Sequence, residues 1–392
     1  MKIASLTSVT DNKNFGFSQL RVAIVHYWLI GMRGGERVLE ELLEIFPQAD
    51  IFTHVYDSES VSPRIRSQKV KQSFIGHLPR ARRHYQSYLP LMPMALEELD
   101  LRGYDLIISS ESGPAKGIIP PSEAFHLCYC HSPMRYVWNM YNEYKESSNF
   151  ITRSLMRPLS HYMRLCDVAG AARVDHFVAN SNAVARRIEK YYRRDADVVP
   201  PPVDIDSFAI GRSEDFYLYC GQLVPYKRVD VAIEACNRLG RRLIVIGSGS
   251  DIKRLTQIAG PTVTILGAQP FEVLREHYAR CRALLFPGEE DFGIVPVEAM
   301  ASGRPVIGYG RGGLCDTVID GKTGILFEKQ TTESLIDAIK HFERIETGFD
   351  PKTIRDHAAT FNKIRFRLSI SQIIACRMQL PEIKAPANRA FL

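Results

Sequence analysis

Two glutamates lie eight residues apart in the segment EDFGIVPVE, Glu290–Glu298. The apolar run ALLFP before them predicts a buried strand, and IVPVEAMAS predicts a helix that ends before Gly303. Pro296 suits the first turn of that helix, where a missing N–H costs nothing. The first N–H groups of a helix have no backbone partner and can bind an anion or a hydroxyl. Two carboxylates around such a helix start can hold one long, hydroxyl-rich ligand, unless they only cap the helix.

A lysine stands at a second predicted strand–helix turn, in GQLVPYKRVD, Gly221–Asp230. An ammonium at such a turn can reach and neutralise a diphosphate, so Lys227 is a candidate binding residue. The alternative is an ordinary surface lysine. We expect Arg228 beside it to point elsewhere along the helix.

Glycine pairs mark two further turns. Gly34 and Gly35 follow a predicted strand in MRGGERVLEELLEIF and precede a helix whose apolar residues share one face. Without side chains, such a pair lets the backbone approach a ligand closely. Gly312 and Gly313 open another helix in the same way, and we expect them to shape the pocket.

His131 ends a predicted strand in CYCHSPMRYVW, where Pro133 forces a turn. At the carboxyl edge of a sheet the imidazole would face a ligand, although a histidine within the core is the alternative. Arg135 and Tyr136 follow and could extend the site. Further on, Ser181 is expected to cap the next helix.

Strand and helix patterns alternate along the whole chain, which predicts parallel sheets covered by helices on both faces. The predicted strands are Val22–His26, Leu106–Ser109, Phe125–His131, His176–Ser181, Phe216–Cys220, Leu243–Gly247, Val263–Gly267, Ala283–Pro287 and Pro305–Tyr309. The predicted helices include Gly35–Phe46, Asn182–Tyr192, Val229–Leu239, Phe271–Arg280 and Thr332–Ile345. The pattern restarts after three prolines at 200–202, so we place a domain boundary near residue 205.

The segment Glu290–Glu298 resembles the E-x7-E motif of family 4 glycosyltransferases. That family has the GT-B fold, α/β with two Rossmann-like domains whose parallel sheets face each other across a cleft. The resemblance implies that Glu290 touches the donor sugar and that Glu298 holds the nucleotide ribose. It further implies that the backbone from Phe292 through Gly293 and Ile294 to Val295 meets the sugar and phosphate.

The same resemblance assigns the remaining candidates. Lys227 matches the lysine that neutralises the leaving diphosphate, but Gln222 stands where the family commonly has arginine, which removes one positive charge. His131 would contact the donor sugar, so we expect His131, Lys227 and Glu290 to act in catalysis. The other implied contacts are Gly34 and Gly35 at the phosphates, Gly247 in a loop that reads the base, and Arg135 and Tyr136 at the acceptor.

The resemblance covers nearly the whole chain and predicts its division. Residues 1–205 would form the acceptor domain and 206–365 the nucleotide-sugar domain, while a C-terminal helix and tail, 366–392, would return to the first domain. It is tightest to a bacterial subgroup that builds O-antigen and exopolysaccharide, through HYWLIGMRGGERVLE, CYCHSPMRYVW and EEDFGIVPVEAMASG.

That subgroup implies a retaining α-mannosyltransferase that uses GDP-mannose and a polyprenyl-diphosphate-linked acceptor, with no metal cofactor. A UDP-sugar donor such as UDP-glucose is the nearest alternative. A GT-B epimerase acting on UDP-N-acetylglucosamine is another. A degenerate, non-catalytic subunit that binds a sugar nucleotide is a third, made conceivable by Gln222.

The distribution of charged residues along the chain predicts a further binding partner. The net charge is +6, and no acidic residue lies between Glu59 and Glu97, a window in which lysine and arginine alternate with apolar residues. A second acid-free window spans residues 147–166. We expect the basic, apolar segments 64–92 and 153–164 to contact an anionic membrane surface, unless they form only a solvated face. Nucleic acid is not an expected partner, because no motif for it appears.

The expected location is the cytoplasm, at the inner face of the plasma membrane. No apolar run reaches the ~18 residues that span a bilayer, and the first twenty residues do not read as a secretion signal. The eight scattered cysteines are expected to be free thiols, as in a reducing compartment.

Overall fold

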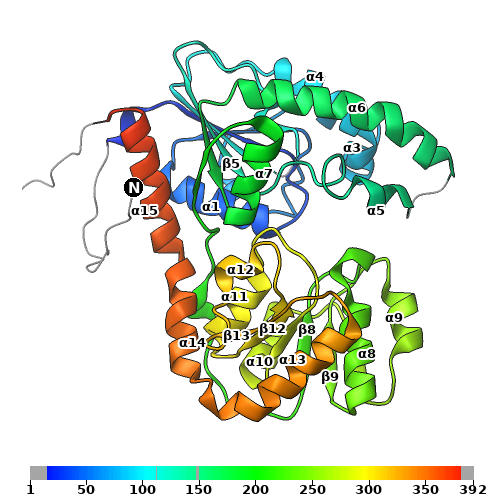
Figure 1. Cartoon of the computed structure of the whole chain (residues 1–392). Helices are drawn as coiled ribbons and strands as arrows, with labels where there is room; N and C mark the ends of the chain where they lie inside the picture. Colours follow the sequence, from blue (N-terminus) through cyan, green and yellow to red (C-terminus); the bar gives the residue numbers. More distant parts are fainter. Residues whose placement is uncertain (1–15, 112, 147–149, 381–392) are drawn as a thin grey trace, which may run out of the picture.

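The computed structural model describes residues 16–111, 113–146 and 150–380. It shows two domains stacked one above the other in Figure 1. The segment expected to lack a secretion signal falls mainly in residues 1–15, and the predicted tail in 381–392, so both lie outside the described residues.

The first domain is built on a parallel sheet in the order β3-β2-β1-β4-β5-β6-β7. Strands buried on both faces carry near-continuous apolar runs, and β1 is buried at every residue. The strands are β1 (Val22–His26), β2 (Asp50–Thr53), β3 (Val70–Gln72), β4 (Leu106–Glu111), β5 (Phe125–Cys130), β6 (His176–Ala179) and β7 (Ala196–Val198).

The second domain repeats the arrangement with a parallel sheet in the order β10-β9-β8-β11-β12-β13. Its strands are β8 (Tyr217–Cys220), β9 (Leu243–Ile246), β10 (Val263–Gly267), β11 (Leu284–Phe286), β12 (Val306–Tyr309) and β13 (Gly324–Phe327). The strand order reverses between β8 and β11, which is where parallel α/β sheets bind ligands. The two parallel sheets confirm the predicted pair of Rossmann-like domains.

Helices cover both faces of each sheet. Alternate residues of β1 show this, because Val22 and Ile24 join one apolar cluster while Ala23 and Val25 join another. The helices of the first domain are α1 (Gly34–Ile45), α2 (Pro63–Arg66), α3 (Ala81–His84), α4 (Met92–Glu97), α5 (Tyr141–Glu146), α6 (Phe150–Ala172) and α7 (Asn182–Tyr192). The later helices are α8 (Val229–Leu239), α9 (Ile252–Ile258), α10 (Phe271–Arg280), α11 (Ile294–Ala301), α12 (Leu314–Thr317), α13 (Thr332–Ile345), α14 (Pro351–Ala358) and α15 (Lys363–Arg377).

The last helix crosses back to the first domain, as predicted (Figure 1). α15 begins at Lys363, three residues before the expected start, and Arg367 Nε lies 3.5 Å from Glu41 Oε2 of α1. Phe366 is buried in the first domain's core, with its ring centroid 5.6 Å from that of Tyr129. The domain limits at 205 and 365 remain predictions.

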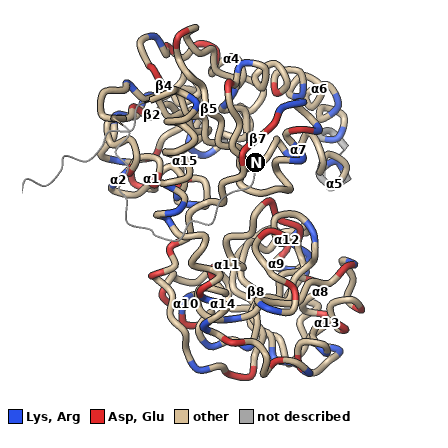
Figure 2. Tube along the Cα trace, turned by 60° about the vertical axis from the view of Figure 1, so that its left-hand side comes forward, with Lys and Arg blue, Asp and Glu red and all other residues tan. Residues whose placement is uncertain are grey.

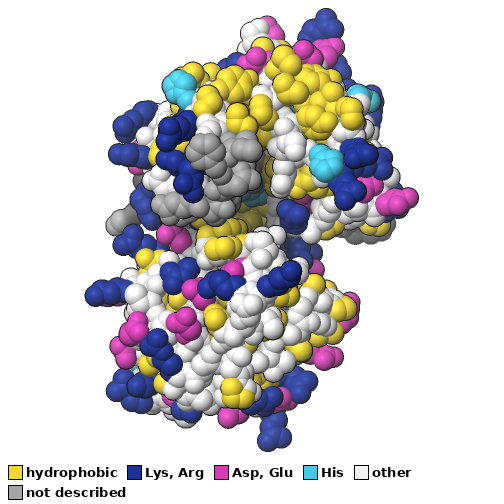
Figure 3. All heavy atoms as spheres, turned by 90° about the vertical axis from the view of Figure 1, so that its right-hand side faces the viewer, with side chains coloured by type: hydrophobic (Ala, Val, Ile, Leu, Met, Phe, Trp, Pro, Cys, Tyr) yellow, Lys and Arg dark blue, Asp and Glu magenta, His cyan; other side chains and the backbone are white. Residues whose placement is uncertain are grey.

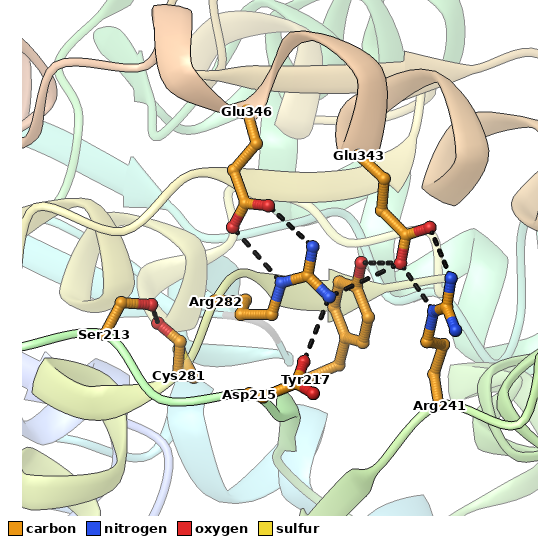
Figure 4. Close-up of polar contacts among 8 residues, drawn as sticks. All are labelled: Ser213, Asp215, Tyr217, Arg241, Cys281, Arg282, Glu343 and Glu346. Carbon is orange, nitrogen blue, oxygen red and sulfur yellow. Dashed lines mark hydrogen bonds and ion pairs between the residues drawn. The ribbon is translucent and has the colours of Figure 1, made fainter.

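A charged network ties the amino ends of the second sheet to the end of α13 (Figure 4). Arg282 pairs with Asp215, Glu343 and Glu346 at 2.6–3.4 Å. Glu343 also accepts from Arg241 at 2.7 Å and from the Tyr217 hydroxyl at 3.0 Å. Ligands bind at the carboxyl ends of parallel strands, so this network at the other edge is structural.

Other sequence-based expectations concern the cysteines and the membrane. All eight cysteines are free thiols, as predicted. Within the described ranges, no helix is both long and apolar enough to cross a bilayer. Lysine and arginine alternate with acidic residues over both domains in Figure 2, so the basic windows are local features.

The return of α15 gives a test of the fold. Phe366→Ala should lower the free energy of unfolding by about 3–5 kcal/mol, because it leaves a cavity in the core. The matched control is Ile364→Ala on the same helix, where the side chain is 51% exposed and the loss should be small. Thermal unfolding of both variants checks this, and equal losses would contradict the packing of α15.

Candidate active site

The loop after β11 carries the first glutamate of the pair into the start of α11. Gly293, the residue before the helix, has φ 92°, a left-handed conformation that favours glycine. Pro296 lies in the first turn, as expected, and the opening N–H groups have no acceptor within the helix. The segment from Phe292 to Val295 therefore presents a backbone able to bind an anion or hydroxyl.

Lys227 and Glu290 form an ion pair between neighbouring strands of the second sheet. Lys227 ends a short 3-10 helix (Pro225–Lys227) after β8, and Glu290 follows β11, which pairs with β8. Gly288 permits the contact, because a Cβ there would lie 2.9 Å from the Lys227 carbonyl oxygen. Both charged side chains are largely buried, 17% and 20% exposed.

Burial, with a smaller contribution from the nearby Arg135 guanidinium, lowers the pKa of Lys227 to about 8, although Asp291 acts in the opposite direction. The paired carboxylate of Glu290 also favours the ammonium form. The neighbouring carboxylates therefore stabilise Lys227 in its ammonium form. An anionic ligand would stabilise the same charged form.

Glu298 lies one turn inside α11 and is buried. Its Oε2 accepts from the Tyr278 hydroxyl at 3.1 Å, and its Oε1 accepts from Arg37 Nη1 of α1 at 3.3 Å. Burial raises the pKa of the Glu298 carboxyl, against the lowering effect of Arg37. Arg37 was not predicted, although it lies two residues after the glycine pair Gly34 and Gly35.

The second glycine pair positions the Glu290 loop. A Cβ at Gly312 would lie 2.2 Å from the Glu290 carbonyl oxygen, and one at Gly313 would lie 2.3 Å from that of Asp291. The Gly313 N–H also donates to the Glu290 carbonyl at 2.8 Å. Any larger residue at either position would push the loop away.

His131 lies on the first domain, just after β5 and partly buried. Ser110 Oγ lies 3.0 Å from its Nε2, and burial with the nearby His26 lowers the pKa of His131 to about 3. The imidazole is therefore neutral at ordinary pH and can act only as a hydrogen-bond group. Gly35 lies against it, since a Cβ there would be 3.7 Å from Nε2.

The structure brings Gly34 to the second domain, where its Cβ would lie 2.9 Å from Ile294 Cδ1. Gly34, Ile294 and the N-terminus of α11 thus lie together, and their assignment to a donor site remains a prediction. Gly247 lies against the turn after β8. It has φ 148°, and a Cβ at this position would lie 1.8 Å from the Gly221 carbonyl oxygen. It therefore fixes the turn that carries Gln222, whose side chain is exposed.

The two residues predicted at the acceptor site, Arg135 and Tyr136, contact different domains. Tyr136 donates to Met134 Sδ at 3.0 Å and packs in a small cluster of the first domain. Arg135 instead crosses to the second domain, where its Nη1 lies 3.5 Å from Asp291 Oδ2. Arg228, as expected, turns away and pairs with Asp230 at 3.3 Å.

Further contacts between the domains were not predicted. Arg187 of α7 pairs with Asp291 and, at 3.2 Å, with Glu289 Oε1. Ser181 caps α7 by accepting from Val184 N at 3.1 Å, as predicted, and also donates to the Asp291 carbonyl. The Glu290 loop is thus held by both domains.

No metal site is seen in the described part of the chain. No group of three or more histidine, cysteine, aspartate or glutamate side chains there could hold an ion.

Comparison with protein families now adds to this geometry. The family model described as "Glycosyltransferase Family 4" matches residues 32–207, and the model described as "Glycosyl transferases group 1" matches residues 203–357. Together they span residues 32–357, which include both glycine pairs, Lys227 and the two glutamates. The chain belongs to family 4 of the glycosyltransferases.

Solved structures agree on the GT-B fold. The sucrose-phosphate synthase of Thermosynechococcus elongatus aligns with 92% of this chain and 99% of its own, at a TM-score of 0.71 and 19% identity. HepE of Anabaena, in complex with UDP and glucose, aligns with 91% of this chain and all of its own, at a TM-score of 0.68 and 16% identity.

A curated relative is the D-inositol 3-phosphate glycosyltransferase of Nocardia farcinica. It is 32% identical over 201 residues, 43% of this chain and 45% of the relative. The chain spans about half the length of the curated relatives it matches.

The pKa of Lys227 leads to a test for this family 4 protein. The pKa is lowered, so the ammonium is present below about pH 8 and is lost above it. The affinity for a nucleoside diphosphate should therefore fall as pH rises through 8, by up to about tenfold per unit. Calorimetric titration with GDP or UDP across that range checks this. Lys227→Arg stays charged and should remove the loss; a loss unchanged in Lys227→Arg would contradict the assignment.

Proposed function

We propose that this protein is a retaining glycosyltransferase that moves a sugar from a nucleotide sugar to an acceptor hydroxyl. The observation that carries the proposal is the meeting of Lys227, Glu290 and the N-terminus of α11 between the domains. An ammonium and free N–H groups suit a diphosphate, and a carboxylate suits sugar hydroxyls.

The proposed reaction is a displacement on one face of the sugar. The bond from the anomeric carbon to the diphosphate oxygen breaks while the acceptor oxygen forms its bond from the same side. The acceptor proton passes to the leaving phosphate. Lys227 and the α11 N–H groups stabilise the charge that develops on the leaving phosphate. The sugar hydroxyls are oriented by the neutral imidazole of His131 and by the carboxylate of Glu290. No step needs a metal.

For the donor we propose GDP-mannose, on the resemblance to the O-antigen and exopolysaccharide subgroup. A cavity of about 200 Å³ is lined by Arg37, the partner of Glu298, and by Phe271, the first residue of α10. A UDP-sugar is the second candidate, favoured by the complex of HepE with UDP and glucose.

For the acceptor we propose a polyprenyl-diphosphate-linked glycan. The curated relative is named for an inositol phosphate, so a phosphate-bearing acceptor has a parallel among similar proteins. The non-catalytic alternative rests on neutral Gln222 and predicts nucleotide binding without turnover.

Nucleotide binding and turnover test the reaction. At one hundred times its Kd, the matching nucleotide should stabilise the fold by ~2.7 kcal/mol and raise Tm, with GDP expected above UDP and ADP. Lys227→Ala and Glu290→Ala should lower the turnover of GDP-mannose with a lipid-linked glycan by roughly 10²–10³.

Lys322→Ala, an exposed lysine in the same domain, is the matched control and should keep normal turnover. Near-normal kcat/KM in either site variant would show that its role is wrong. Stabilisation by UDP alone would overturn the GDP donor, and binding without turnover would favour the non-catalytic alternative.

We also propose that the first domain docks on an anionic membrane. Figure 3 shows hydrophobic side chains gathered on that domain, with lysine and arginine beside them. Its exposed apolar residues include Leu91, Met94, Leu155, Tyr162, Leu165 and Val168, from the region of α4 and from α6. Arg173 at the end of α6 pairs with Glu97 of α4 at 2.9 Å, which joins the two helices.

Several basic residues of this surface form ion pairs or hydrogen bonds within the protein, so fewer remain to contact a membrane. Arg64, Lys69, Lys71 and Arg82 each pair with an acidic residue from outside the acid-free window. Arg164 donates to the Val137 carbonyl at 2.6 Å. The membrane proposal therefore rests on the exposed Arg80, Arg83 and Arg157.

Vesicle co-sedimentation tests the docking. Leu155→Asp with Leu165→Asp should weaken binding to phosphatidylglycerol vesicles at least about tenfold, because each buried leucine contributes ~1.5–3 kcal/mol. Ile319→Asp replaces an equally apolar residue, 43% exposed, on the second domain and should bind normally. Equal losses in both variants would sink the proposal.

A further inference from the structure

Arg135 is a cation of the first domain placed beside Lys227 of the second. Its side chain is 16% exposed, and its Cζ lies 5.8 Å from the ring centroid of Tyr226. Lys227 Nζ lies 5.8 Å from the same centroid. One aromatic ring therefore borders two cations that come from different domains.

Each cation faces a carboxylate of the same loop. Lys227 pairs with Glu290, and Arg135 Nη1 lies 3.5 Å from Asp291 Oδ2. The loop thus supplies adjacent acids to neutralise both charges. An anion that takes the place of these carboxylates would meet the two cations together.

The present partners of Arg135 leave it incompletely satisfied. Its Nη2 donates to the Glu289 carbonyl at 3.4 Å, a long hydrogen bond. Its Nε is buried and has no hydrogen-bond partner among the described residues. A buried N–H without a partner is costly, so its presence points to a ligand that would complete it.

Charge balance indicates which ligand this is. A donor diphosphate is charged on each phosphoryl group and gains charge as the sugar leaves. Lys227 supplies one cation, while Gln222 is neutral and Arg228 turns away to Asp230. A guanidinium fork matches phosphate oxygens with two parallel hydrogen bonds, which a lysine cannot do.

We propose that Arg135 is the second cation for the donor diphosphate and reaches it across the cleft from Lys227. The inference rests on the proposed function and moves Arg135 from the acceptor side, where the sequence suggested it, to the donor. Arg135 belongs to the first domain, so contact with the diphosphate requires the two domains to be together. Asp291, once displaced, keeps its ion pair with Arg187.

Nucleotide preference tests the proposal in the full chain. The ratio of Kd for GMP to Kd for GDP, or for UMP to UDP, measures recognition of the second phosphate by calorimetry. Arg135→Gln should lower this ratio about tenfold, the value of one charged hydrogen-bond pair. Arg135→Lys keeps a point charge and should give an intermediate ratio, which also covers a glutamine variant that fails to fold.

Arg187→Gln is the matched control, because Arg187 pairs with the same Asp291 and with Glu289. It should leave the ratio unchanged even if both nucleotides bind more weakly. An unchanged ratio in both Arg135 variants, or an equal fall in Arg187→Gln, would overturn the proposal, because Arg135 would then serve the acceptor or only hold the domains together. A wild-type protein that binds none of these nucleotides would instead refute the proposed function itself.

Discussion

The ion pair between Lys227 and Glu290 is the constraint on which the cleft depends. It requires the turns after β8 and β11 to touch, and the pairing of these strands places their ends side by side. Glycines at 288, 312 and 313 then remove the side chains that would keep the backbones apart. The result is a carboxylate and an ammonium held at the start of α11, each balancing the charge of the other until an anion enters.

The loop that carries Glu290 also connects the two domains. Asp291 pairs with Arg187 and Arg135, and Ser181 donates to its carbonyl, so residues beside the proposed donor site also make contacts between the domains. Glu298 also contacts the other domain, because Arg37 of the first domain donates a hydrogen bond to one of its carboxylate oxygens. A donor that binds these carboxylates must exchange places with arginines of the first domain. In the proposed function, donor binding would therefore be coupled to the relative position of the domains through these ion pairs.

Burial assigns different electrostatic roles to the two sides of the cleft. His131 has its pKa lowered to about 3 and is neutral, so in the proposed reaction it can offer the sugar only a hydrogen bond. The cationic charge next to the Glu290 loop comes instead from Lys227, with Arg135 adjacent to it. A neutral group near the sugar and cations near the phosphates match the charge that develops as the sugar leaves a diphosphate.

The sequence by itself determined the features that depend on local periodicity and on short motifs. The helices Asn182–Tyr192, Val229–Leu239, Phe271–Arg280 and Thr332–Ile345 have the predicted bounds, because apolar spacing and turn residues define them locally. The strands β2, β3, β7 and β13 were not among those predicted. The edge strands β3 and β7 are partly exposed and carry little apolar pattern. The long α6 was also missed, and it contains Pro158, which ordinarily indicates a helix end.

Only the tertiary structure decided which side chains meet across the cleft. The pairing of Arg37 with Glu298 joins residues 261 positions apart, and the direction of Arg135 depends on where the second domain lies. The packing of α15 on the first domain fixes that relation, through buried residues such as Phe366. Local sequence patterns contain no information on such distances, because a long-range contact is set by how whole domains pack and not by neighbouring residues.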